Sequence, residues 1–268
     1  MNRIEKRVTA CRESGRKMLI PFITAGDPDL KITLQTMQSM VKAGADMIEL
    51  GIPFSDPVAD GPVIQRACER ALLNTVTTKQ VVDIVKEFRK TDQETPIIFM
   101  GYMNPIEVMG YSKFTTLISE AGVDAVIAVD MTPEESNEYS KAMNAAGLES
   151  IYLITPTTPE ERIKRIVSLA GGFVYYVSVR GVTGAAELDL NEISAKIKQI
   201  KQHTKLPVGV GFGIRDQKSA TEIASVSDAV IIGSAIVRIH ENLNQTPEQI
   251  PAAVSEFITG IRTALDGM

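Results

Sequence analysis

The sequence predicts an α/β fold, a (β/α)8 TIM barrel with an additional N-terminal helix, formed by a single domain over residues 1–268. Three observations predict it: short apolar runs recur eight times, segments with helical spacing separate them, and 268 residues with 44% hydrophobic content suit one barrel. Parallel strands need crossover helices and are buried on both faces, so eight such units favour closure into a barrel. An open, doubly wound sheet is the alternative.

The predicted strands are the eight apolar runs. They cover residues 18–24, 46–52, 96–100, 124–129, 150–155, 173–178, 206–212 and 228–233. A helix with Ile4, Val8 and Cys11 on one side precedes the first run, and we expect it to plug the bottom of the barrel.

The helices between the strands have readable faces and ends. The helix from about Lys31 ends at Gly44, and the helix at 190–201 places an isoleucine on one face at each turn. Three further helices share one start signal at Thr132, Thr158 and Thr246, with Thr as N-cap, Pro at the first helical position and Glu or Gln at the third.

The composition excludes several classes of protein. The net charge of −5 comes from interspersed charges without a basic stripe, so nucleic acid is not an expected partner. Two cysteines, Cys11 and Cys68, cannot build a disulfide framework. The N-terminus has no apolar signal core, and the apolar runs are shorter than the roughly 20 residues of a membrane span. We therefore expect a cytoplasmic protein that does not bind a membrane.

The barrel prediction makes two carboxylates candidate catalytic residues, because active sites of this fold lie at the carboxyl ends of the strands. Glu49 ends the second strand, and the alternation of Ile48 and Leu50 places it on the barrel-facing side. A buried carboxylate acquires a raised pKa or a partner and suits general acid–base catalysis. Asp60 follows in a proline-rich loop. The alternative roles are a helix cap or a lysine partner for Glu49, and an N-cap for Asp60.

Glycines after later strands indicate a phosphate site. Gly209, Gly211 and Gly213 follow the seventh strand, and Gly233 and Ser234 follow the eighth, where a helix begins. Barrels commonly hold a phosphate there through backbone N–H groups, which needs close approach but no cation. A further glycine-rich turn at 181–184 follows the sixth strand, and tight packing is the alternative explanation for each turn.

Other chemistries do not fit. His203 and His240 lie on helical segments without metal-ligand spacing, which speaks against a metal site. No predicted strand ends in lysine, as a Schiff-base aldolase requires, and no Gly-x-Gly-x-x-Gly opens the first βα unit for a dinucleotide. The chemistry that still fits the sequence is acid–base catalysis on a phosphate ester. Four aromatic residues near strand ends are candidates for lining the pocket or for filling the core: Phe22, Tyr102, Tyr175 and Phe212.

Six blocks of sequence carry a resemblance to a known family. They read PFITAGDP (21–28), ELGIPFSDPVADGPVIQ (49–65), MGYMNP (100–105), GVTG (181–184), VGFGI (210–214) and GSAIV (233–237). In this order, and across nearly the whole chain, they resemble the signature blocks of the tryptophan synthase alpha subunit family, and the second block is highly specific.

The resemblance implies a barrel that cleaves indole-3-glycerol phosphate to indole and glyceraldehyde 3-phosphate by a retro-aldol reaction. Glu49 would be the general acid–base, and Asp60 would bind the indole N–H and stabilise the positive charge that develops on the ring. The residues implied around the substrate are Phe22, Tyr102, Tyr175, Thr183 and Phe212, and those implied around its phosphate are Gly184, Gly213, Gly233 and Ser234.

The resemblance also implies a partner. The family works in an alpha2beta2 complex with a beta subunit that carries pyridoxal phosphate and receives the indole, whereas the alpha chain itself binds no cofactor. The loops near Asp56, Asn104 and Pro105 are polar and shaped by proline, and we expect them to dock that subunit.

Two segments depart from the family pattern, Val179-Arg180 and Met131-Thr132-Pro133. Two other function classes remain open. A sugar-phosphate isomerase on another phosphate-binding barrel would use Glu49 as a base without an indole pocket. A chain that only activates the beta subunit would need neither carboxylate.

Overall fold

The computed structural model describes residues 1–178, 189–211 and 213–268. The strands are β1 (Met18–Thr24), β2 (Ile48–Gly51), β3 (Ile97–Gly101), β4 (Ala125–Ala128), β5 (Glu149–Ser150), β6 (Leu153–Ile154), β7 (Val174–Val177), β8 (Val208–Gly211) and β9 (Ala229–Ile232). The helices are α1 (Arg3–Glu13), α2 (Leu30–Lys42), α3 (Pro62–Leu73), α4 (Thr78–Arg89), α5 (Met103–Met109), α6 (Tyr111–Ala121), α7 (Asn137–Ala145), α8 (Glu160–Leu169), α9 (Leu190–Lys201), α10 (Gln217–Ala224), α11 (Ser234–Asn242), the short 3-10 helix η1 (Pro247–Gln249) and α12 (Ile250–Asp266).

All strand pairs are parallel, in the order β5-β4-β3-β2-β1-β9-β8-β7-β6. The two ends of this order, β5 and β6, are consecutive pieces of one segment, 149–154. The first piece pairs with β4 and the second with β7, and the Ile151 N–H and the Tyr152 carbonyl continue the hydrogen bonding on the two sides. The segment therefore closes the sheet into a barrel of eight strand positions, as predicted, with the fifth strand in two pieces.

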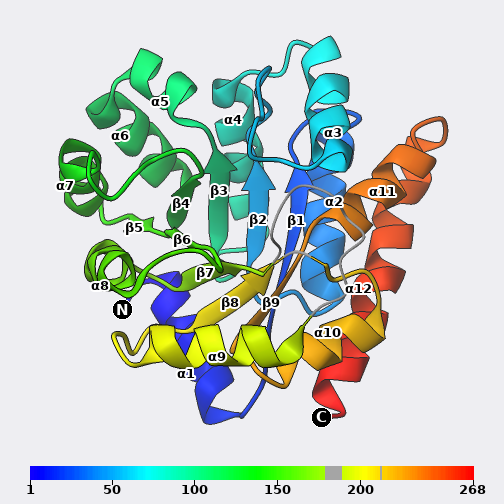
Figure 1. The fold of residues 1–268 in the computed structure, drawn as a ribbon. Helices are drawn as coiled ribbons and strands as arrows, with labels where there is room; N and C mark the ends of the chain where they lie inside the picture. Colours follow the sequence, from blue (N-terminus) through cyan, green and yellow to red (C-terminus); the bar gives the residue numbers. More distant parts are fainter. Residues whose placement is uncertain (179–188, 212) are drawn as a thin grey trace.

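The barrel separates two apolar layers. Neighbouring residues of β1 alternate between them: Leu19 belongs to the large cluster under the surrounding helices, and Ile20 belongs to a cluster inside the barrel. In Figure 1 the helices surround the strands, and α1 lies at the end opposite the arrowheads of β2 and β3. Ile4 and Cys11 of α1 are buried in the interior cluster, so the prediction that this helix plugs the barrel bottom is confirmed.

Helix starts were predicted less well than helix faces. The three isoleucines of α9 at positions 193, 197 and 200 are buried, as expected. The three Thr-Pro signals are only partly correct. After Thr132 the chain forms a turn and α7 begins at Asn137, α8 begins one residue late with Pro159 as its N-cap, and Thr246 starts the short helix η1. Pro is also favoured at the second position of type I and type II turns, so it does not fix where a helix begins.

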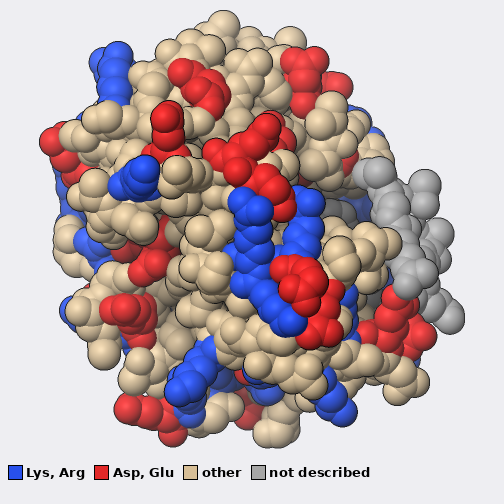
Figure 2. All heavy atoms as spheres, turned by 60° about the vertical axis from the view of Figure 1, so that its left-hand side comes forward, with Lys and Arg blue, Asp and Glu red and all other residues tan. Residues whose placement is uncertain are grey.

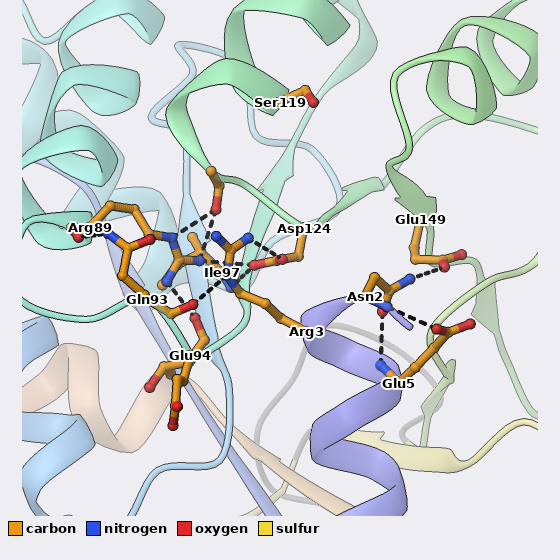
Figure 3. Close-up of polar contacts among 12 residues, drawn as sticks. Asn2, Arg3, Glu5, Arg89, Gln93, Glu94, Ile97, Ser119, Asp124 and Glu149 are labelled. Atoms are coloured by element: carbon orange, nitrogen blue, oxygen red, sulfur yellow. Dashed lines mark hydrogen bonds and ion pairs between the residues drawn. The ribbon is translucent and has the colours of Figure 1, made fainter.

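Polar side chains fasten α1 to the barrel bottom, as Figure 3 shows. Arg3 donates to Asp124 Oδ1 at 3.0 Å, and Arg89 donates to Asp124 Oδ2 at 2.9 Å. Asn2 donates to Glu149 Oε1 at 2.6 Å while its own side chain caps α1. Asp124 also accepts the Ile97 N–H. One carboxylate thus ties α1, α4 and β3 together.

Replacing Asp124 by Asn should lower the free energy of unfolding by about 3 kcal/mol, because it breaks a buried ion pair and leaves Arg89, among the described carboxylates, with only the longer contact to Asp92 at 3.9 Å. Urea unfolding at neutral pH measures the change. The control is Asp83→Asn, which breaks the exposed pair with Lys86 and should cost less than about 1 kcal/mol. Similar small losses in both variants would contradict the structural role of Asp124.

Charges on the outer surface are intermingled. On the face shown in Figure 2, acidic and basic side chains lie among large areas of other residues. Several are paired, such as Arg162 with Glu134 at 3.3 Å and Lys164 with Glu161 at 2.7 Å. Within the described ranges, none of the helices is both long and apolar enough to cross a bilayer.

Candidate active site

Glu49 lies inside the barrel, on β2, with its side chain 1% exposed. Its neighbours Ile48 and Leu50 pack outward under the helices, so the predicted alternation is confirmed. In the sheet register Glu49 stands between Phe22 of β1 and Ile98 of β3. Its Oε2 atom is buried without a hydrogen-bond partner among the residues that the structure describes. The alternative roles of a helix cap or a lysine partner for Glu49 therefore do not fit.

Burial raises the pKa of Glu49 to about 8, and the nearby negative charge of Asp60 contributes to the rise. The carboxyl group consequently carries its proton at neutral pH. A buried acid that loses and regains a proton near physiological pH is suited to general acid–base catalysis.

Asp60 lies in the loop between β2 and α3 and is 5% exposed. It is not the N-cap of α3: Gly61 holds that position, without a side-chain cap. Instead Asp60 Oδ2 accepts a hydrogen bond of 2.8 Å from the Tyr102 hydroxyl. Burial raises the pKa of Asp60 to about 6, and the hydrogen bond from Tyr102 acts in the opposite direction. The two carboxyl groups therefore differ in protonation between pH 6 and 8.

A cavity of about 660 Å³ opens at the carboxyl ends of the strands and contains both carboxylates. Tyr175 stands in it, and a Cβ atom on Gly211 would lie 2.1 Å from the Tyr175 hydroxyl oxygen, so glycine is required there. The apolar part of the wall includes Met100, Ile127 and Leu153. These three residues were not predicted to line the cavity, although their inward-facing positions at strand ends could have indicated them.

The predicted residues fall into several groups in the structure. Tyr102 and Tyr175 lie with the carboxylates, while Phe22 packs in a small cluster with Val63, Ala67 and Val237. A Cβ atom on Gly51 would lie 2.7 Å from the Phe22 ring. Phe22 is thus a fully packed side chain at the level of Glu49.

Three of the predicted phosphate residues, Gly213, Gly233 and Ser234, follow β8 and β9. Gly213 has a φ of +77°, a conformation that L side chains rarely adopt. Gly233 is the N-cap of α11 and Ser234 is its first residue. Thr183, Gly184 and Phe212 lie outside the described residues.

The predicted partner residues lie near the mouth of the barrel. Asp56 is exposed in the loop before Asp60, and Asn104 and Pro105 form part of the first turn of α5. Two apolar side chains on the same segments are strongly exposed, Val58 at 79% and Val108 at 83%.

Each of the two histidines contacts a polar group of the protein. His240 is buried on α11, and its Nδ1 lies 2.8 Å from the Asp27 carbonyl oxygen. His203, which was expected within a helix, follows the end of α9 and contacts Glu160 at 3.3 Å. Among the residues that the structure describes, no cluster of three or more His, Cys, Asp or Glu side chains could hold a metal ion.

Comparisons with known proteins agree on one family. The family model described as "Tryptophan synthase alpha chain" matches residues 8–265. The tryptophan synthase alpha chain of Alkalilimnicola ehrlichii is 51% identical over 268 residues, covering 100% of this chain and 98% of that protein.

Solved structures agree with the sequence matches. The tryptophan synthase alpha subunit of Legionella pneumophila superposes with a TM-score of 0.93 at 43% identity, covering 100% of both chains. A chain of the tryptophan synthase complex of Pyrococcus furiosus superposes with a TM-score of 0.83 at 31% identity, covering 92% of this chain and 98% of that one.

Proposed function

This chain belongs to the tryptophan synthase alpha chain family, and from that premise we propose that Glu49 and Asp60 are the residues that perform its reaction. The chain is a carbon–carbon lyase of tryptophan biosynthesis, which cleaves indole-3-glycerol phosphate to indole and glyceraldehyde 3-phosphate. The assignment of roles to individual residues is the proposal.

Glu49 acts first as an acid and then as a base. Its carboxyl group donates a proton to C3 of the indole ring, which leaves positive charge on the ring nitrogen. The resulting carboxylate then takes the proton of the hydroxyl group on the adjacent side-chain carbon. The carbon–carbon bond breaks, its electron pair returns to the ring, and the hydroxyl carbon becomes the aldehyde of glyceraldehyde 3-phosphate. Glu49 ends protonated, as it began.

One observation supports this cycle above the others: Glu49 is buried, lacks a hydrogen-bond partner for Oε2 among the described residues, and has a pKa raised to about 8. The cycle needs a carboxyl group that is protonated before substrate arrives, and an ordinary exposed glutamate would not be.

Asp60 has the complementary role. With a pKa near 6 it is mainly ionised at neutral pH, and it lines the same cavity as Glu49. A fixed carboxylate accepts the indole N–H and stabilises the positive charge that C3 protonation creates. The two carboxyl groups thus divide the work because their surroundings separate their pKa values.

The remaining predicted residues are proposed to hold the substrate. Backbone N–H groups at the start of α11 suit a phosphate, because the N-terminus of a helix carries partial positive charge. We assign the phosphate to Gly184, Gly213, Gly233 and Ser234, and the surroundings of the indole and glycerol to Phe22, Tyr102, Tyr175, Thr183 and Phe212. Met100, Ile127 and Leu153 add an apolar wall that suits the indole ring.

The proposed partner is the beta subunit in an alpha2beta2 complex, with pyridoxal phosphate on that subunit alone. The similar Pyrococcus furiosus chain belongs to a tryptophan synthase complex, which supports a partner for this chain as well. Val58 and Val108 expose apolar side chains beside the polar residues Asp56 and Asn104, and such a mixture is typical of protein interfaces. The loop with Asp56 and Val58 continues into Ala59 and Asp60 of the cavity wall, so docking there would place the partner beside the cavity from which indole leaves.

Reversing the charge at Asp56 should weaken this complex by about tenfold, because a misplaced rim charge opposes electrostatic complementarity. Gel filtration and a binding titration of Asp56→Lys against the beta subunit measure the effect. Asp83→Lys on α4 is the matched control and should bind normally. Unchanged binding of Asp56→Lys would count against this docking surface.

The experiment that tests the whole assignment is indole release from indole-3-glycerol phosphate, with and without a beta subunit. Wild-type protein should release indole, faster with the partner, and the Glu49 and Asp60 variants should release it at least about 100-fold more slowly. Release at a rate near that of wild type by a folded protein that lacks either carboxylate would refute the roles given to them. Isomerisation of a sugar phosphate without indole release would support the isomerase alternative.

A further inference from the structure

Tyr102 is joined to the catalytic loop by two hydrogen bonds. Its hydroxyl donates to Asp60 Oδ2 at 2.8 Å and accepts the Ala59 N–H at 3.0 Å. The side chain is 5% exposed, and its ring stacks on Phe54 with a centroid separation of 5.2 Å. Because Ala59 occupies an acceptor site of the hydroxyl oxygen, the phenolic hydrogen is directed to Asp60.

We propose that Tyr102 is a positioning residue for the reaction: its hydroxyl fixes the direction of the Asp60 carboxylate in the cavity and keeps it ionised at neutral pH. This inference rests on the proposed function of Asp60. It assigns Tyr102 an effect through Asp60 that contact with the substrate alone would not produce.

The surroundings of Asp60 explain why such a residue is needed. The titratable groups that interact with it among the described residues are Glu49 on β2, Cys68 on α3, Tyr175 on β7 and Tyr102 itself. None of these groups carries a positive charge. Burial opposes ionisation of Asp60, and of the named groups only Tyr102 donates a hydrogen bond to its carboxylate. A charge-assisted hydrogen bond of this kind favours the ionised form.

The pH dependence of the reaction follows. Asp60 must be ionised to stabilise the ring cation, so activity falls as the pH drops through the pKa of Asp60. Without the Tyr102 hydroxyl that pKa rises, and the acid limb of the profile moves to higher pH. A hydrogen bond to a charged group of ordinary strength corresponds to a shift of about one pH unit.

The test compares wild type with Tyr102→Phe, which keeps the ring on Phe54 and removes only the hydroxyl. The control is Tyr139→Phe, which removes the hydroxyl of another buried tyrosine, one on α7 that does not line the cavity. For each protein kcat/KM for indole release is measured from about pH 5 to about pH 9, a range that spans both carboxyl pKa values. The Asp60 carboxyl is titrated separately by carbon NMR without substrate, with its signal assigned by its loss in Asp60→Asn.

We expect the acid limb and the Asp60 titration of Tyr102→Phe to move upward together by about one unit, and those of Tyr139→Phe to stay in place. Activity of Tyr102→Phe that is reduced equally at all pH values, with an unshifted Asp60, would overturn the proposal. If Tyr102→Phe does not fold, the wild-type titration decides, because an Asp60 that titrates above neutral pH is not kept ionised. The proposed function fails separately, when wild-type protein releases no indole at any pH.

Discussion

Replacing Glu49 by Gln is expected to reduce indole release by about 10⁴-fold or more, because general acid–base catalysis contributes about 10²–10⁴ to one proton transfer and Glu49 is proposed to perform two. The amide is nearly the same size as the carboxyl group, so the cavity should stay intact. Single-turnover measurements with saturating substrate separate this loss from a loss of binding. Glu87→Gln on α4 is the matched control and should keep full activity. A folded Glu49→Gln protein with activity near that of wild type would refute the acid–base role.

The same variant should be more stable than wild type in alkaline solution. The pKa of Glu49 is about 8 in the folded protein against an ordinary value of 4.5, so the folded state holds the proton more tightly. The contribution of Glu49 to the free energy of unfolding is therefore greatest below pH 4.5 and is lost as the pH rises to 8. The neutral amide in Glu49→Gln does not undergo this change, so urea unfolding at about pH 9 should show a gain of roughly a few kcal/mol. Equal alkaline stability of the two proteins would contradict the raised pKa.

Replacing Asp60 by Asn should lower kcat by about 10²–10³-fold, the usual loss when one electrostatic stabiliser of a transition state is removed. The amide cannot neutralise the ring cation, although its oxygen can still accept the indole N–H, so KM should change less than kcat. Steady-state kinetics with and without the beta subunit measure both. Asp83→Asn serves as the matched control.

Asp60→Asn should also move the alkaline limb of the pH profile. The negative charge of Asp60 contributes to the raised pKa of Glu49, so its removal lowers that pKa and moves the limb to lower pH. If the residual activity of Asp60→Asn is too small for a pH profile, an NMR titration of the Glu49 carboxyl measures the same shift. An alkaline limb that moves upward would contradict the coupling between the two groups.

Much of the fold could be predicted from the sequence because alternation and helical spacing are local signals. Ile48, Glu49 and Leu50 alternate between the two sides of β2 as their pattern indicates. The break between β5 and β6 and the late start of α7 were not predicted, since both depend on how turns fit neighbouring elements.

The candidate site could be predicted in part. An acid within an apolar strand indicated a catalytic role for Glu49. For Asp60 the sequence favoured a catalytic role and an N-cap role equally, and the structure shows that Gly61 is the N-cap. The bond between Tyr102 and Asp60 joins residues 42 positions apart, and no local pattern indicates such a contact. The apolar wall likewise draws residues from β3, β4 and β6, so only the closed barrel brings them together.

The seam between β1 and β9 has a consequence for how the chain folds. Met18 pairs with Ala229, 211 positions along the chain (229 minus 18), whereas most other strand pairs join neighbours in sequence. Closing so long a loop carries an entropy cost that local pairs do not, although the cost grows only with the logarithm of loop length. Contacts of this range slow folding. The open sheet of consecutive strands can therefore assemble before its edges meet, and the cavity that opens at the strand ends becomes complete only with that last pairing.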